Sequence, residues 1–276
     1  MNLSSKFAIE NLLKKYGIKP FKGWGQNFLI NEGILKKIIK AADLEQNDYI
    51  LEIGPGIGTL TKELAQKARK VVAVEKDRKM MQILKETLRD SKNIEIINAD
   101  ALKIIPEFLF QKNNYKVVAN LPYNIASAVI RKFLESENPP KEMILMVQKE
   151  VAQRICAKVP DMNILAISVQ FYSEPKILFY VSKNYFWPKP KVDGAIIKLE
   201  TKNRKRKIDK NLFFKIVKAG FSQPRKQILN NLSKVLKLDK EKTKIWLKKC
   251  DIKENQRAET LKIKDWLKLV KNYTIQ

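Results

Sequence analysis

The stretch YILEIGPGIG, residues 49–58, decides the fold of this chain of 276 residues. Its first five residues form an apolar run typical of a buried strand, and its three glycines allow the backbone to turn tightly and approach a ligand. A strand, a glycine-rich turn and a helix in this order are typical of nucleotide-binding α/β sheets. The third glycine comes one residue earlier than in the dinucleotide fingerprint, and Thr59 takes its expected place. This spacing disfavours a nicotinamide-dependent dehydrogenase.

The pattern that follows alternates between apolar strands and amphipathic helices. We expect further strands at residues 71–74, 94–97, 117–119 and 143–147, with helices at 60–68, 78–88 and 126–134. Strands and helices that alternate at this spacing indicate a parallel, doubly wound sheet. Two later apolar runs, residues 177–181 and 195–199, are expected to close the sheet as a hairpin around a proline-rich loop. The predicted fold class is therefore α/β, with a Rossmann-like sheet.

Helical segments flank this sheet at both ends of the chain. At the N-terminus we expect helices within residues 1–20 and 34–42, separated by a loop that contains two glycines and two aromatic residues. The basic run Lys202–Lys207 marks a boundary, and helices are expected beyond it at 212–219, 226–236, 240–249 and 263–270. We therefore predict two domains: residues 1–205, of which 1–45 hold the N-terminal helices and loop, and an all-helical domain of residues 206–276.

The chain carries a formal net charge of +26, and more than half of it lies in the last 76 residues. From Thr201 to Gln276 there are 23 lysines and arginines against seven aspartates and glutamates, a net charge of +16. Such a skew favours a polyanionic partner, most simply RNA or DNA, for the C-terminal helices. A lysine-rich proteome or solvated helix faces would account for part of the excess.

Histidine is absent from the chain. Its absence excludes histidine-based acid–base chemistry, Ser-His triads and histidine-ligated metals, and we expect no metal site. Any chemistry must rely on carboxylates, amides, aromatic rings or a reactive cofactor. The reaction rate should then show no enzyme titration near pH 6–7.

Nothing in the composition indicates a membrane or secreted protein. The sequence holds no apolar run of the roughly eighteen residues that a membrane span requires. Residues 1–6 lack an apolar signal core, so a cytoplasmic protein is expected. Cys156 and Cys250 lie far apart without ligand spacing and are interpreted as ordinary reduced residues.

Polar side chains stand at three predicted strand ends. Glu75 ends the second strand, where a carboxylate can accept both ribose hydroxyls of a nucleoside, and Asp100 follows the third, where it can accept from an adenine amino group. Asn120-Leu121-Pro122-Tyr123 follows the fourth and combines an amide, a rigid turn and a flat ring for stacking a base. The alternatives are a surface salt bridge for Glu75, a helix N-cap for Asp100 and a plain strand-to-turn junction at Asn120.

Together these segments resemble a class I S-adenosylmethionine-dependent methyltransferase that acts on an exocyclic adenine amine. Four more narrow the resemblance to the small-subunit ribosomal RNA adenine N6,N6-dimethyltransferase family: Gly25-Gln26-Asn27-Phe28-Leu29, Phe186-Trp187-Pro188-Lys189-Pro190-Lys191-Val192-Asp193, Phe221-Ser222-Gln223-Pro224-Arg225-Lys226 and Arg257-Ala258-Glu259-Thr260-Leu261. The match covers essentially the whole chain, in order. Gly194 stands where the family usually has Ser, and Pro224 where it usually has a basic residue.

The resemblance implies how the cofactor S-adenosylmethionine would be held. Asn27 and Leu29 would close over it, and Gly54 would lie by its methionine part. Glu75 would bind its ribose, and Asp100 its adenine ring. For Asn27, a loop-capping amide is the alternative interpretation.

The resemblance also implies how the target adenine would be held. Asn120 would lie between the cofactor and the base, and Tyr123 and Phe186 would sandwich the base; for Phe186 the alternative is core packing. Hydrogen bonds from the target amine to the Asn120 side-chain oxygen and to the Leu121 or Pro122 carbonyl would draw the nitrogen toward tetrahedral geometry. That positioning aligns its lone pair with the methyl group without a general base.

By the same resemblance, residues 1–205 are the S-adenosylmethionine-binding catalytic domain and residues 206–276 a basic RNA-binding domain. The implied substrate is a pair of adjacent adenines in the 3′-terminal hairpin loop of small-subunit (16S) ribosomal RNA in the assembling 30S subunit, and a monomer is expected. Two alternatives stay open: the sister family that methylates large-subunit RNA and confers macrolide resistance, and a non-catalytic RNA-binding assembly factor on the same fold. The C-terminal motifs argue against the first, and the intact cofactor motifs against the second.

Overall fold

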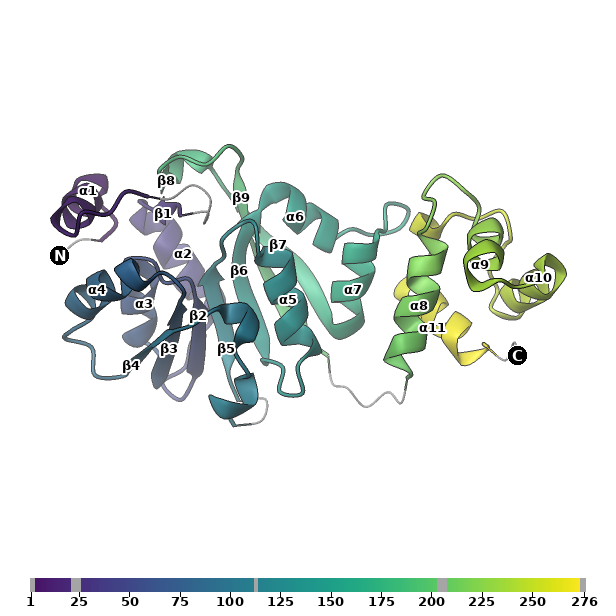
Figure 1. The fold of residues 1–276 in the computed structure, drawn as a ribbon, viewed down its shortest axis with the longest axis horizontal. Helices are drawn as coiled ribbons and strands as arrows, with labels where there is room; N and C mark the ends of the chain where they lie inside the picture. Colours follow the sequence, from purple (N-terminus) through teal and green to yellow (C-terminus); the bar gives the residue numbers. More distant parts are fainter. Residues whose placement is uncertain (1–2, 21–25, 112–113, 203–207, 274–276) are drawn as a thin grey trace. The chain divides into compact units, whose positions relative to one another are not determined.

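The computed structural model describes residues 3–20, 26–111, 114–202 and 208–273. Two compact units result: Met1–Ala152 with Glu174–Thr201, built on a sheet, and Gln153–Ser173 with Lys202–Gln276, built on helices (Figure 1). The boundary that the sequence predicts at residue 205 lies outside the described residues, as do Gly25 of the N-terminal motif and most of the basic run at 202–207. Residues 153–173 belong to the helical unit, although the sequence places them with the sheet.

Seven strands form the sheet of the first unit, in the order β4-β3-β2-β5-β6-β9-β7. Their bounds are β2 Tyr49–Ile53, β3 Lys70–Glu75, β4 Ile94–Asn98, β5 Lys116–Asn120, β6 Glu142–Gln148, β7 Ser173–Val181 and β9 Gly194–Thr201. The pairs β2–β3, β3–β4, β2–β5 and β5–β6 are parallel, and β6–β9 is antiparallel. The predicted doubly wound α/β sheet is confirmed, with its two late strands side by side at one edge.

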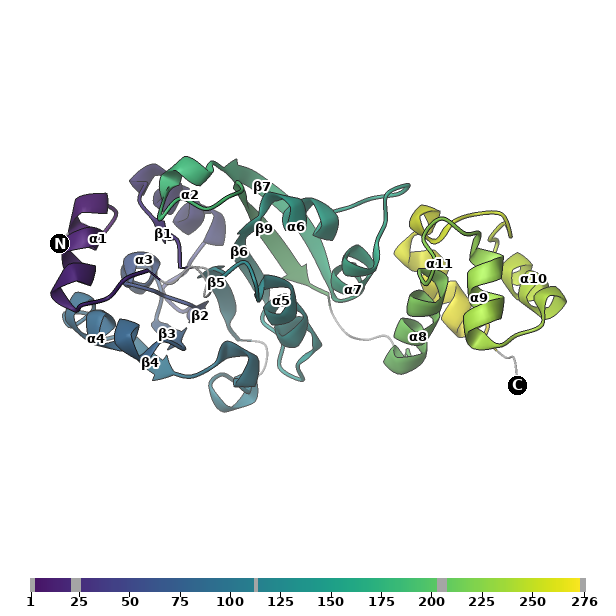
Figure 2. The same ribbon diagram turned by 45° about the horizontal axis from the view of Figure 1, so that its top comes forward.

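Helices cover both faces of this sheet. α2 (Glu32–Ala42), α3 (Thr59–Ala65) and α4 (Arg78–Thr87) lie on one face, and α5 (Ala126–Glu135) lies on the other (Figure 2). On the first face, Ile38 and Leu64 pack with Val118 of the central strand β5. Successive strand residues point to opposite faces, so a strand covered on both faces must be apolar throughout.

The strand order reverses between β2 and β5, which places a crevice beyond the carboxyl ends of these strands. The turn that leaves β2 requires glycine at two positions. Gly54 has a φ of +69° and Gly56 a φ of +59°, values that residues with a side chain rarely adopt. A Cβ on Gly56 would also lie 3.2 Å from the Phe28 ring. The turn therefore comes close to the N-terminal segment at the edge of the crevice.

The structure adds a second, two-stranded sheet that the sequence pattern does not predict. β1 (Phe28–Leu29) pairs antiparallel with β8 (Phe186–Trp187), with Phe28 opposite Trp187 and Leu29 opposite Phe186. α1 (Lys6–Lys15) and Phe28 share an apolar cluster with residues of α4. The segment around Phe28 is thus attached to the rest of the first unit by two contacts, the pairing with β8 and the apolar cluster with α1 and α4.

The second unit is a bundle around one apolar core, to which Ile167, Phe213, Leu232, Leu247 and Trp266 contribute. Its helices are α7 Ile164–Tyr172, α8 Lys210–Gly220, α9 Ile228–Leu236, α10 Lys240–Lys249 and α11 Ile263–Lys271. The last four match the predicted helices within two residues at each end. α6 (Lys149–Ile155) and α7 are absent from the sequence prediction. Among the described helices, none combines the length and the apolarity that crossing a bilayer requires.

Candidate active site

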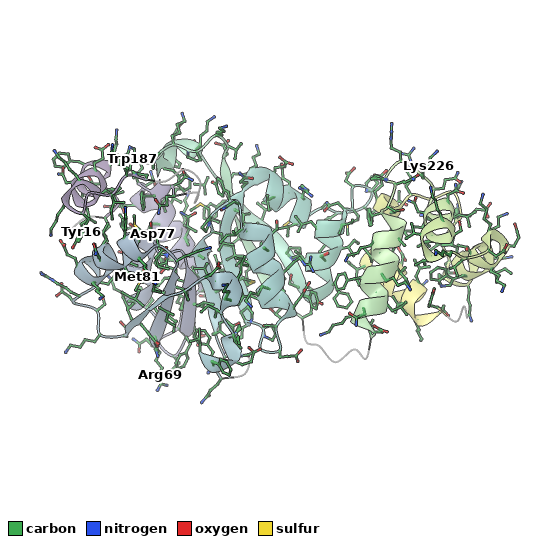
Figure 3. The ribbon with its side chains drawn as sticks, in the orientation of Figure 1. Tyr16, Arg69, Asp77, Met81, Trp187 and Lys226 are labelled. Atoms are coloured by element: carbon green, nitrogen blue, oxygen red, sulfur yellow. The ribbon has the colours of Figure 1, made fainter. Side chains whose placement is uncertain are left out.

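A cavity of about 210 Å³ opens beyond the carboxyl ends of β2, β3 and β5. Every site residue that the sequence predicts lines this cavity: Asn27, Leu29, Gly54, Glu75, Asp100, Asn120, Leu121, Pro122, Tyr123 and Phe186. Parallel strands end at the same edge of a sheet, which is why residues far apart in sequence meet here. Figure 3 shows Asp77, just beyond β3, at this edge, and Arg69, just before β3, at the opposite edge.

Backbone amides hold the Glu75 carboxylate in one orientation. Its Oε2 accepts from the Gly56 amide over 3.3 Å, and its Oε1 accepts from the Asp77 amide over 2.8 Å. Burial raises the pKa of Glu75, while these two hydrogen bonds act to lower it. Each carboxylate oxygen has a second lone pair, so the group can still accept from two ligand hydroxyls. The side chain is buried, which disfavours the alternative of a surface salt bridge.

Asp100 is both a cap and a cavity residue. Its Oδ1 accepts from the Leu102 amide at the start of the short helix Ala101–Lys103, and its Oδ2 accepts from the Lys76 ammonium over 2.9 Å. The Lys76 ammonium, followed by the Leu102 amide, lowers the pKa of Asp100, so the carboxyl is ionised at neutral pH. Asp100 is therefore an N-cap, as the alternative interpretation expects, and the capping bond fixes its carboxylate at the cavity wall.

The N-terminal segment orients the Asn120 amide. Asn120 Nδ2 donates to the backbone carbonyl of Asn27 over 3.3 Å. Because a carbonyl can only accept, Asn120 must present its NH₂ group to Asn27, and its side-chain oxygen must face the other way. This contact spans 93 residues of sequence, so Asn120 does more than end a strand.

Two aromatic residues from different segments line the cavity. Phe186 is only 3% exposed and belongs to the same apolar cluster as Leu29, so core packing and a cavity position coexist in it. Tyr123 is half-buried, and its hydroxyl oxygen is inaccessible and has no hydrogen-bond partner among the described residues. Burial, together with the negative charge of Asp193, raises the pKa of Tyr123 to about 12. The Tyr123 ring therefore stays neutral at physiological pH.

Glu52 is a cavity residue that the sequence analysis does not single out. It is 2% exposed, and its Oε2 finds no hydrogen-bond partner in the described part of the chain. Burial, with a contribution from the nearby Glu75, raises the pKa of Glu52 to about 8. A buried acceptor without a partner is unfavourable unless a ligand satisfies it, and a cationic group suits it best. The available signal is a lone carboxylate inside the otherwise apolar strand YILEI.

Comparison with known proteins agrees with this geometry. A family model described as ribosomal RNA adenine dimethylase matches residues 19–274. The chain belongs to the ribosomal RNA adenine dimethylase family. A relative from Dehalococcoides mccartyi, named ribosomal RNA small subunit methyltransferase A, is 42% identical over 268 residues, covering 96% of this chain and 92% of its own length. The protein of that name from Clostridioides difficile is 43% identical over 274 residues, covering 96% and 94%.

Two solved structures share the architecture. A dimethyladenosine transferase from Plasmodium falciparum is 31% identical with a TM-score of 0.76, covering 89% of this chain and 96% of that one. The 23S rRNA methyltransferase ErmE is 26% identical with a TM-score of 0.72, covering 89% and 98%. Members of the dimethylase family use S-adenosylmethionine, and this chain is an S-adenosylmethionine-dependent ribosomal RNA adenine methyltransferase.

The cavity of this dimethylase suits that cofactor. Glu75 and Asp100 offer oriented acceptors for a ribose and an adenine amine, and Glu52 offers a buried acceptor for an ammonium group. The glycine turn at Gly54 and Gly56 lets the backbone come near without a Cβ in the way. The donor and acceptor set thus matches an amino-acid-bearing nucleoside with a positive charge.

We expect Glu75→Gln and Asp100→Asn each to weaken cofactor binding about tenfold, because each replaces a charged acceptor by a neutral one. Glu75→Gln is chosen because it keeps one acceptor oxygen for the Gly56 or the Asp77 amide, whereas Glu75→Ala would leave both amides without one. Isothermal calorimetry with S-adenosylhomocysteine measures the change. Unchanged affinity in both variants would show that the nucleoside lies elsewhere.

Gly194 is not required by the backbone. Its φ is not positive, and an added Cβ would meet only ordinary contacts, 3.4 Å from the Tyr123 hydroxyl and 3.5 Å from the Val147 carbonyl. A serine hydroxyl there would lie within reach of the Tyr123 hydroxyl, which has no described partner.

We expect Gly194→Ser to raise the free energy of unfolding by about 1–2 kcal/mol, through a new hydrogen bond and a stiffer strand. Gly194→Ala is the matched control, since it stiffens the strand without adding a hydroxyl. Urea denaturation of both variants, with and without Tyr123→Phe, measures the effect. Equal gains for Ser and Ala would mean that no hydrogen bond forms.

Proposed function

We propose that this dimethylase methylates the N6 amines of two adjacent adenines in the 3′-terminal hairpin loop of small-subunit (16S) ribosomal RNA, in the assembling 30S subunit. The names of the relatives that are 42% and 43% identical over nearly the whole chain support a small-subunit substrate. We also propose that it acts as a monomer in the cytoplasm, because the cavity is lined by a single unit of the chain and ribosome assembly is cytoplasmic.

The observation that carries this proposal is the oriented Asn120 amide. Its NH₂ group is engaged by the Asn27 carbonyl, so its oxygen faces away from that carbonyl as an acceptor. Asn120 stands between Glu75 and Asp100, which suit a nucleoside cofactor, and Tyr123, which suits a stacked base. An acceptor in this position matches an amine that carries N–H donors.

In the proposed mechanism, two oxygens of this chain hold the target amine. One is the Asn120 side-chain oxygen. The other is the Leu121 or the Pro122 carbonyl, of which the Pro122 carbonyl also accepts from the Ile125 amide over 3.1 Å. Two acceptors on one nitrogen draw it out of conjugation with the ring, so that its lone pair points in a single direction. S-adenosylmethionine, when bound, supplies an electrophilic methyl group.

No residue of the site needs to act as a general base. The nitrogen becomes acidic once it carries an additional substituent, and its proton can pass to water. A monomethylated amine keeps one N–H for the Asn120 oxygen, so the same contact can serve the second transfer. This chemistry is consistent with a chain that lacks histidine.

The target adenine must leave its stack before it can reach Asn120, which costs a few kcal/mol. Stacking on Tyr123 and Phe186 can return about 1–3 kcal/mol for each contact. Phe186 is held by the β1–β8 pair and by the core, so its ring is fixed before the base arrives. A pre-ordered ring loses little entropy on binding.

The helical unit offers a rigid basic turn for the RNA backbone. Arg225 and Lys226 are exposed in the turn between α8 and α9. The buried Asn231 side chain donates to the Gly220 carbonyl over 2.6 Å and to the Gln223 carbonyl over 3.0 Å. These two hydrogen bonds hold the backbone of the turn in place. Pro224, where the family usually has a basic residue, leaves two cations in this turn.

We expect Arg225→Gln with Lys226→Gln to weaken RNA binding and to reduce the slope of log Kd against log salt by about 1.4–1.8, because each lost phosphate contact changes it by about 0.7–0.9. Cofactor affinity should not change. The matched control is Lys85→Gln with Lys92→Gln, two exposed lysines of the sheet unit. An unchanged slope would reject the turn as an RNA contact.

Mass mapping of methylated adenines in ribosomal RNA, with and without this protein, tests the proposal. Two adjacent dimethyladenines near the 3′ end of small-subunit RNA should appear only with the protein. Methylation of large-subunit RNA would favour the alternative of the large-subunit methyltransferase family, and the solved structure of the 23S rRNA methyltransferase ErmE shares the fold. Absent cofactor binding by calorimetry would favour a non-catalytic assembly factor.

A further inference from the structure

We infer that Gln26 and Asp77 form a latch that holds residues 26–29 over the cavity and, through Asn27, sets the orientation of the Asn120 amide. Gln26 Nε2 donates to Asp77 Oδ2 over 3.0 Å. Both are positioning residues, since the contacts that define the latch join them to the chain and not to the target. The latch itself rests on these contacts alone, whereas its effect on the rate of methyl transfer rests on the proposed function.

Asp77 is a firm anchor because each of its polar groups is engaged. Its Oδ1 caps α4 by accepting from the Lys79 amide over 2.9 Å, and its own amide donates to Glu75 Oε1 over 2.8 Å. The side chain is 9% exposed. Asp77 lies at the cavity edge of the sheet, on the same side as Trp187 of β8 (Figure 3). The Oδ2 atom that receives Gln26 therefore has one fixed position.

Asn27 lies between two attachments. On one side, Phe28 and Leu29 pair with β8, and the Ile30 amide donates to the Tyr185 carbonyl over 2.8 Å. On the other side, Gln26 is bonded to Asp77. The carbonyl between them is the one that receives Asn120 Nδ2. If the bond to Asp77 is lost, the Asn27 carbonyl loses one of the contacts that position it, and the Asn120 amide becomes freer to rotate.

The latch thus connects two strand ends with different tasks. Asp77 follows β3, whose Glu75 faces the nucleoside, and Asn120 ends β5, where the target amine would be held. Residues 26–29 bridge them, and Asn27 and Leu29 also line the cavity. The same contacts therefore hold residues 26–29 over the cavity and orient the Asn120 amide.

Three measurements on Gln26→Ala test the latch. Amide hydrogen exchange in residues 26–30 of the ligand-free protein should become about tenfold faster, the effect of losing one hydrogen bond to a charged acceptor. S-adenosylhomocysteine should dissociate faster by a similar factor. The single-turnover rate at saturating cofactor should fall about tenfold, and Gln26→Ala should cause no further fall in an Asn120→Ala background.

Two variants serve as controls. Gln82→Ala truncates an exposed glutamine of α4 and should leave all three measurements at wild-type values. Asp77→Asn keeps the cap and can still bond to Gln26 through a flipped amide, so it should retain most of the protection from exchange. Unchanged exchange in Gln26→Ala would overturn the latch, and an equal rate loss with and without Asn120 would overturn its link to the target. If the wild-type protein transfers no methyl group, the proposed function is rejected, and the exchange experiment still tests the latch.

Discussion

Asn120→Ala is expected to lower the rate of methyl transfer by about 10²–10³, the scale seen when one pre-organised polar group is removed from a transition state. The variant loses the oxygen that holds the target amine, and it also loses the bond from Nδ2 to the Asn27 carbonyl. RNA affinity should barely change, because we propose that phosphate contacts of the basic helical unit dominate it. Single-turnover methyl transfer to assembled small subunits measures the rate.

Two further variants separate the tasks of Asn120. Asn120→Asp keeps an acceptor for the amine but places a carboxylate against the Asn27 carbonyl, so it should disturb residues 26–29 as well as the rate. Asn11→Ala, at an exposed position of α1, is the control for truncating an asparagine and should act like wild type. A near wild-type rate for Asn120→Ala would mean that this residue does not hold the target amine.

The second large effect concerns Glu52 and pH. In the free protein, burial raises the pKa of Glu52 to about 8, so the carboxyl is mostly protonated at neutral pH. A cationic ligand group favours the ionised form, so binding below about pH 8 must release a proton. Cofactor affinity relative to Glu52→Gln should therefore rise about tenfold for each pH unit from about pH 6 to 8, or about 100-fold in all.

Calorimetry of S-adenosylhomocysteine with wild type and Glu52→Gln across this range measures the effect, since ionisations of the ligand are common to both proteins. Stability gives an independent check with a defined sign. A carboxyl whose folded-state pKa is raised stabilises the fold at low pH, and this stabilisation is lost as pH rises from the ordinary value of 4.5 to about 8. Ligand-free wild type should lose up to about 1.4 kcal/mol per pH unit within this range and nothing further above it, and Glu52→Gln should show no such loss. If the cofactor affinities of wild type and Glu52→Gln change with pH in parallel, the cationic group of the cofactor binds elsewhere.

Glu52 is a titrating group that composition does not reveal, while the expectation of a rate without an enzyme titration near pH 6–7 stays a prediction. The absence of histidine predicts a rate without an enzyme titration near pH 6–7, and this expectation treats carboxylates as ionised throughout that range. A carboxylate in the middle of a buried strand does not follow that rule, because desolvation moves its pKa toward neutrality. Only the burial of Glu52 in the folded chain shows that this one, among the 29 acidic residues, departs from the rule.

The sequence by itself determined the sheet, the four C-terminal helices of the basic unit and the polar residues at the strand ends, because these follow from local rules. Asn27, Leu29 and Phe186 were predicted from the family resemblance. Strand and helix periods, glycines at 54, 56 and 58, and polar residues directly after apolar strands are all readable within a few neighbouring residues. Parallel strands then bring those ends together without further information.

Tertiary structure alone decided what joins distant segments. The β1–β8 pair, the bonds of Asn120 to Asn27 and of Gln26 to Asp77, and the packing of residues 153–173 with the C-terminal helices each connect parts of the chain that no local pattern relates. Such contacts depend on which surfaces the completed fold brings within hydrogen-bond distance. For the same reason the sequence could propose Asn120 as the target-binding residue, but only the fold showed which way its amide is turned.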